Sequence, residues 1–152
     1  MNRSWRIAEI LIAVLTTSVN CTTRSPCPRD EDAVRQAVFK WQIAREPSVQ
    51  LICIGLMPES SSELVSPEPS LVEKISGGSV RVKTWAECRG LRSQEAFAGR
   101  QFVVGHIEWL SAIRADVDGL LPGTAYRYEL SCAAGNWHVE GAWRRGDAHV
   151  GW

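Results

Sequence analysis

The sequence predicts an α+β domain in which a curved antiparallel sheet wraps around one long N-terminal helix and one short helix. Apolar residues recur every three or four positions after Asp30, as they do on one face of an amphipathic helix. From Arg100 to Arg145, β-branched and aromatic residues stand at every second position between turn residues, which is typical of an antiparallel meander. A chain of 152 residues with a net charge of zero fits a single domain and gives no electrostatic argument for binding nucleic acid.

The first 20 residues have the composition of an export signal. Arg3 and Arg6 precede an apolar run over residues 7–14, which is shorter than the roughly 20 residues that a membrane-spanning helix needs. Two processing routes stay open. Cleavage near residues 16–18 would release a soluble protein, whereas cleavage before Cys21 would leave that cysteine for lipid attachment in a bacterial cell envelope. Residues 21–29 contain two prolines and no apolar period, so they are expected to form a linker before a single domain over residues 30–152.

The five cysteines fit an exported protein held by disulfides. If Cys21 carries a lipid, four cysteines remain and allow three connectivities. We expect Cys53 to pair with Cys88 from a neighbouring strand, and Cys27 to fasten the N-terminal tail to Cys132 in the meander. The alternative is that Cys53 is a small buried hydrophobic residue. Because the sequence has no C-x-x-C pair and its histidines are scattered, no metal or other cofactor is expected.

The first half of the domain is expected to alternate helices and strands. Asp30 can cap the long helix, which should stop before Pro47. The nearly continuous apolar run over residues 49–57 predicts a deeply buried strand, and the polar residues 59–68 predict a surface loop. Residues 69–75 form the short helix, residues 80–88 alternate as a half-buried strand, and residues 89–99 are expected to be an exposed loop.

The meander is expected to contain strands near residues 102–110, 113–118, 126–132 and 137–144, with turns at Leu121-Pro122-Gly123-Thr124 and at residues 134–136. Strict alternation places one row of side chains on a common face, and Gly105 marks a candidate bulge. That row contains Phe102, Val104, His106, Glu108 and Leu110. The last strand is expected to present an apolar row of Trp137, Val139, Gly141 and Trp143.

This order of elements, closing with Gly135-Asn136-Trp137-His138-Val139, resembles the cystatin-like cone of the ketosteroid isomerase and nuclear transport factor superfamily over residues 30–145. It also resembles exported bacterial proteins of unknown function that are built this way. The resemblance implies a curved sheet around helices, forming a cone whose open end can be a pocket.

Three function classes are compatible with this cone. An isomerase or dehydratase would need a buried acid or base and hydrogen-bond donors for an oxyanion, for which His106, Glu108, Tyr126 and Tyr128 are weak candidates. Asp116 and Asp118 could suggest a metal, but beside Arg114 they are more typical of a charged outer face.

The second class is a non-catalytic envelope domain that binds a small ligand or a protein partner through an aromatic cone mouth, and the third is a structural interaction module held by disulfides. The candidate ligand-binding residues are Trp85, Trp109, Trp137 and Trp143, which ordinary core packing would also explain. We expect a non-catalytic envelope domain, in contact with a membrane only through a lipid on Cys21. Orientation discriminates between the classes: the enzyme hypothesis requires His106 and Glu108 to point into a cavity that a tyrosine hydroxyl also reaches.

Overall fold

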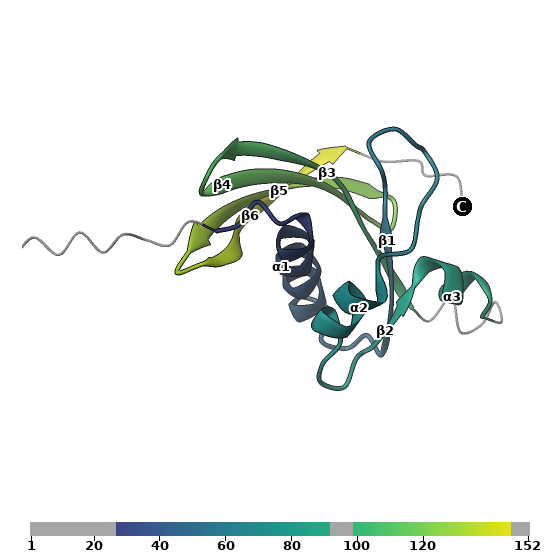
Figure 1. Ribbon diagram of the computed structural model, residues 1–152. Coiled ribbons are helices and arrows are strands. Elements are labelled where there is room, and N and C mark those ends of the chain that lie inside the picture. The colour runs from purple at the N-terminus through teal and green to yellow at the C-terminus, as the bar shows by residue number, and fades with distance from the viewer. Residues whose placement is uncertain (1–26, 92–98, 147–152) are drawn as a thin grey trace, which may run out of the picture.

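The computed structural model describes residues 27–91 and 99–146, and these form an α+β fold built on one open, curved sheet (Figure 1). In chain order the elements are α1 (Glu31–Ala44), β1 (Leu51–Leu56), α2 (Pro69–Ile75), β2 (Arg81–Thr84), α3 (Trp85–Arg89), β3 (Arg100–Ser111), β4 (Arg114–Leu121), β5 (Thr124–Ala133) and β6 (Asn136–Gly146). None of the helices in the described part of the chain is long and apolar enough to cross a membrane. The predicted export signal, Cys21 and most of the linker lie outside the described residues.

The sheet is mixed, with six strands in the order β2-β1-β3-β4-β5-β6. Strands β3 to β6 form the predicted antiparallel meander, but β1 runs parallel to both of its neighbours, β2 and β3. The expectation of a wholly antiparallel sheet is therefore wrong. A strand buried on both faces is typical of parallel pairing, and five of the six residues of β1 are buried.

Helix α1 lies against one face of the sheet and fills the core there (Figure 1). The Asp30 carboxylate accepts a hydrogen bond of 2.9 Å from the backbone nitrogen of Asp32, so the helix begins with the predicted cap. Val34, Val38 and Phe39 are completely buried and belong to the same apolar cluster as residues of β1, β3, β4 and β5. The apolar stripe predicted from the sequence thus points at the sheet.

The strand predicted over residues 80–88 is wrong in its second half, because β2 stops at Thr84 and α3 follows. Thr84 and Glu87 form a capping box in which each side chain accepts a hydrogen bond from the other residue's backbone nitrogen. The backbone nitrogen and the hydroxyl of Thr84 both donate to the Glu87 carboxylate, and these two hydrogen bonds lower the pKa of that carboxyl. The threonine and the glutamate three positions later were the signal for a helix start, which the alternation of apolar residues concealed.

Two disulfides join distant parts of the fold, Cys27 with Cys132 and Cys53 with Cys88, and the pairing coincides with the one expected. Cys88 reaches Cys53 from helix α3, however, and not from a neighbouring strand. The first disulfide anchors the start of the described chain to β5, and the indole nitrogen of Trp137 on the neighbouring β6 donates a 3.3 Å hydrogen bond to the Pro28 carbonyl.

Candidate functional site

A bulge in β3 decides which side chains of the sheet face the core. Between the pairs Val104–Gly119 and Ile107–Val117, β3 advances by three residues while β4 advances by two. The extra residue falls at the predicted place, beside Gly105, and it reverses the alternation beyond that point. Val104 and Ile107 therefore share the core face, whereas His106 is exposed.

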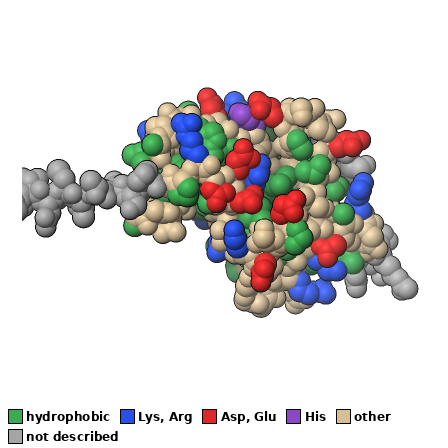
Figure 2. All heavy atoms as spheres, in the orientation of Figure 1, with side chains coloured by type: hydrophobic (Ala, Val, Ile, Leu, Met, Phe, Trp, Pro, Cys, Tyr) green, Lys and Arg blue, Asp and Glu red, His purple; other side chains and the backbone are tan. Residues whose placement is uncertain are grey.

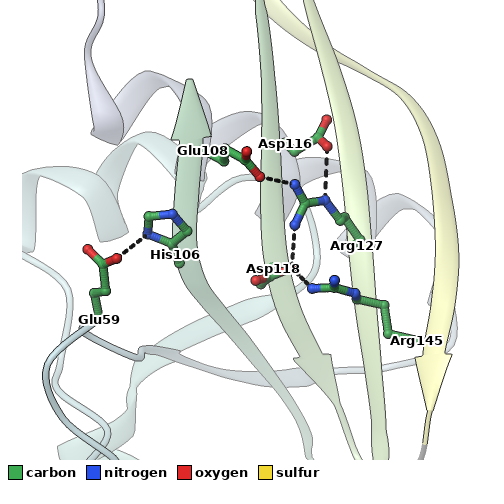
Figure 3. Close-up of polar contacts among 7 residues, drawn as sticks. All are labelled: Glu59, His106, Glu108, Asp116, Asp118, Arg127 and Arg145. Atoms are coloured by element: carbon green, nitrogen blue, oxygen red, sulfur yellow. Dashed lines mark hydrogen bonds and ion pairs between the residues drawn. The ribbon is translucent and has the colours of Figure 1, made fainter. Parts of the chain in front are cut away.

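The single row predicted from strict alternation is consequently wrong. Phe102 and Val104 are buried in the core, but His106 and Glu108 are exposed on the opposite face of the sheet. The imidazole Nδ1 of His106 lies 3.5 Å from a carboxylate oxygen of Glu59 (Figure 3).

Glu108 instead belongs to a network of ion pairs centred on Arg127 of β5 (Figure 3). The Arg127 guanidinium donates from Nε to Asp116 at 2.9 Å, contacts Glu108, and lies 3.5 Å from Asp118. Asp118 also accepts a 3.0 Å hydrogen bond from Arg145 of β6. The hydrogen bond with Glu108 raises the pKa of Arg127. Asp116 and Asp118 are therefore engaged by arginine, in the arrangement of a charged outer sheet face.

The two tyrosines lie on the core face, away from His106 and Glu108. Tyr128 is completely buried, and its hydroxyl oxygen accepts a 2.7 Å hydrogen bond from Nε2 of Gln42 on α1. Burial raises the pKa of Tyr128 to about 12. Its ring stacks on Tyr126 and meets the edge of Trp41, with centroid distances of 6.2 and 5.6 Å. His106 and Glu108 thus lie on one face of the sheet and the two tyrosines on the other, so the four candidate catalytic residues do not converge.

A groove of about 520 Å³ lies between α1 and the beginning of β6. Residues of α1 with helical spacing form one wall, and the β5–β6 turn with the start of β6 forms the other. Its lining consists of Ala33, Gln36, Ala37, Lys40, Trp41, Gly135, Asn136, Trp137, His138 and Val139.

Within this lining, Trp41 and Trp137 supply the aromatic surface. Trp137 is only 6% exposed, and its ring meets the edge of Trp109 at a centroid distance of 5.6 Å. The Arg45 guanidinium lies 3.4 Å from the centre of the Trp41 ring, close enough for a cation–π interaction. Lys40 is the only lysine, arginine, aspartate or glutamate among the described lining residues, so the groove combines aromatic surface with one cation at its wall.

The four tryptophans predicted to form a cone mouth do not converge. Trp137 lines the groove, and Trp109 packs against the Trp137 ring without lining the groove itself. Trp85 is on α3 beside Gly55 of β1. Trp143 is 41% exposed and stands opposite Arg127, on the outer face of the sheet.

The predicted apolar row of β6 is wrong because of a second bulge. Leu130 pairs with Val139 while Glu129 pairs with Gly141, so β6 contains one extra residue and its alternation reverses before Trp143. Sequence reasoning also missed two functional neighbours. Trp41 has the spacing of the helix stripe, which predicts packing against the sheet and not a groove wall, and Gln42 lies four residues after the buried Val38, a spacing that predicts a place at the core.

The fold and the groove define a class of protein: an α+β domain, closed by two disulfides, with a tryptophan-lined groove beside the last strand of an open sheet. Comparisons with protein-family models, with curated proteins and with solved structures found no match. On the face shown in Figure 2, acidic and basic side chains are interspersed with apolar ones, as the zero net charge of the chain suggests.

Proposed function

We propose that this protein is an exported, non-catalytic domain of the bacterial cell envelope that binds a small apolar ligand or a protein partner in the groove between α1 and β6. The observation that carries the proposal is the groove itself, about 520 Å³ in volume and walled by Trp41 and Trp137. Typical ligand sites have volumes of about 300–1,000 Å³ and combine an aromatic lining with a few polar groups. Gln36, Lys40, Asn136 and His138 are the polar residues here.

Export is supported by the two disulfides, since such bonds persist in oxidising compartments. It is supported also by the leader-like residues 1–20. The mature chain is either released or held at the membrane by a lipid on Cys21.

The cystatin-like cone remains our proposed fold family, supported by the long helix beside a curved meander (Figure 1). The alternative function, a small isomerase or dehydratase, would need an acid or base near the tyrosine hydroxyls. It has less support, because His106 and Glu108 lie on the outer face whereas Tyr128 is buried on the core face.

The groove is tested by occluding it. Anilinonaphthalene sulfonate combines aromatic rings with one negative charge, which suits Trp41, Trp137 and Lys40. We expect saturable binding of this dye, measured by its fluorescence, and loss of about tenfold or more in affinity for Ala37→Trp, whose indole fills the space between helix and strand.

The matched control is Ala44→Trp, which adds the same ring at the exposed end of the same helix and should leave the affinity unchanged. Circular dichroism and thermal unfolding of both variants establish that each is folded. If the dye binds both folded variants as tightly as the native protein, the groove is not the binding site and the proposal fails.

A further inference from the structure

The wall of the groove formed by β6 is also a free edge of the sheet. Strand order places β6 at one end and β2 at the other, and among the described residues no strand pairs with the outer side of either. The two edges differ in length, because β2 has four residues whereas β6 has 11. A long edge strand presents a row of unpaired backbone groups that can pair with another chain.

The β5–β6 hairpin determines which backbone groups of β6 point to that edge. Its two loop residues, Ala134 and Gly135, have φ angles of 51° and 77°, as in a type I′ turn. In a hairpin with a two-residue loop, the flanking residues form a hydrogen-bonded pair, and the next pair does not. Ala133–Asn136 is the flanking pair and Cys132–Trp137 is the next.

The neighbouring strand agrees with this assignment. The Cys132 backbone nitrogen donates a 2.9 Å hydrogen bond to Ile113 on the β4 side, and so it is turned away from β6. By alternation, the backbone N–H and C=O groups of Trp137 and Val139 point away from β5, toward the open edge.

The same two residues line the groove, and their side chains face the core side of the sheet toward α1. Across the groove, α1 presents the small residues Ala33 and Ala37, with Lys40 at the wall. A strand added beside β6 would direct every second side chain into this space. The edge of β6 would supply main-chain hydrogen bonds to the added strand, and the groove would determine which of its side chains fit.

We infer that the occupant of the groove is an extended peptide segment of a partner protein, which adds to β6 as a seventh, antiparallel strand along Trp137–Val139. Its groove-facing positions hold an apolar residue against Trp41 and Trp137 and a carboxylate within reach of Lys40. The single cation in a lining with no acidic residue gives this charge preference. This inference rests on the proposed function and narrows the ligand to a peptide strand.

The test uses an acetylated and amidated heptapeptide, Thr-Val-Thr-Val-Thr-Glu-Thr, titrated into the ¹⁵N-labelled domain with its disulfides intact. We expect saturable NMR shifts at the amides of Trp137 and Val139, together with slower hydrogen exchange of these two amides. Replacing the Glu of the peptide with Gln should weaken binding by about threefold to tenfold, because the pairing with Lys40 is lost.

Backbone methylation of the peptide separates strand pairing from simple occupation of the groove. The valine and glutamate amides face β6, so N-methylation of one of them should lower the affinity about tenfold or more. N-methylation of a threonine amide, which faces away, should change it little. Equal effects of the two methylation patterns would overturn strand addition. If anilinonaphthalene sulfonate still binds the native protein and Ala37→Trp weakens that binding, the groove is a site for a small molecule and not for a peptide strand.

Two further outcomes decide against the inference. If millimolar peptide causes no NMR shift at Trp137 or Val139 while the dye still binds, the groove does not bind an extended peptide and the inference is wrong. A concentration-dependent dimer in sedimentation, whose formation protects the same two amides without peptide, makes a second copy of this chain the occupant of the edge.

Val139→Pro removes one edge donor, which an edge strand tolerates, and should abolish the peptide shifts while Val139→Ala retains them.

Discussion

The Nε2 atom of Gln42 donates a 2.7 Å hydrogen bond to the hydroxyl oxygen of Tyr128, and both side chains are almost completely buried. This bond joins α1 to the middle of the meander. Tyr128→Phe leaves the buried Gln42 amide without this partner, so we expect a loss of about 1–3 kcal/mol in the free energy of unfolding. Urea unfolding measures it. The double variant Gln42→Leu with Tyr128→Phe removes both polar groups and should recover most of the loss; a strictly additive double variant would contradict the pairing.

Tyr128 also predicts how stability depends on alkaline pH. Its pKa in the folded protein is about 12, against an ordinary value of 10, because burial disfavours the phenolate. Between these values the native state holds a proton that the unfolded chain has lost, so stability is retained below pH 10 and falls as the pH rises toward 12. The expected loss is about 3 kcal/mol.

The measurement is the stability difference between the native protein and Tyr128→Phe at several pH values. That difference should shrink as the pH rises from 10 to 12. Absorbance titration of tyrosinate should assign a transition near the upper value to Tyr128. A pH-independent difference would show that the phenol is not protected in the core.

Gly119 of β4 lies under the Tyr128 ring. A Cβ atom at this position would stand 2.7 Å from the ring carbon Cε2 of Tyr128 and 3.0 Å from the Val103 carbonyl oxygen. We therefore expect Gly119→Ala to lower the unfolding free energy by about 1–3 kcal/mol, measured by urea denaturation. Gly77→Ala is the matched control, since a Cβ there meets nothing within 4 Å. Equal stability of the two variants would mean that the ring moves aside without cost.

Arg127 holds three carboxylates together on the outer face, and its side chain is 16% exposed. Arg127→Met leaves Glu108, Asp116 and Asp118 facing one another. The expected loss is about 1–3 kcal/mol, between the values for exposed and for buried ion pairs. Because the remaining repulsion is screened by salt, high ionic strength should recover part of it. The exposed Arg81→Met of β2 serves as the control, and a salt-independent loss would point to packing instead of charge.

The two disulfides close loops of different length, with sequence separations of 105 and 35 residues. From loop closure alone, replacing both cysteines of the Cys27–Cys132 pair by serine should cost about 5 kcal/mol, and the same change at Cys53–Cys88 about 4 kcal/mol. Urea unfolding under non-reducing conditions compares the two double variants. A larger loss for the shorter loop would show that local contacts of α3 dominate over chain entropy.

Local patterns in the sequence predicted most elements, because the periodicities of helices and strands are visible within short stretches of the chain. The α1 stripe, the Asp30 cap and the meander strands follow from such patterns. The parallel pairing of β1 is indicated only by its nearly continuous apolar run, which is typical of a strand buried on both faces, and nothing in that run identifies β2 and β3 as its neighbours.

The site was harder to predict because each bulge changes the face of every later residue in its strand. The extra residue beside Gly105 moved His106 and Glu108 outward, and the one near Gly141 did the same to Trp143. Gly105 indicated the first bulge, but the sequence does not show on which side the alternation resumes, and Gly141 was expected to continue a regular row. The groove depends on the distance between α1 and β6, which no local pattern encodes.

The disulfide between Cys27 and Cys132 also determines how the domain would bear mechanical load. A pull on the chain ahead of Cys27 enters the sheet through a covalent bond to β5 and bypasses α1. The hydrogen bonds of β5 to β4 and β6 would then share the force. In an envelope protein held by its N-terminus, α1 would stay seated against the groove while the tether is under tension, and reduction of this one bond would transfer the strain to the helix first.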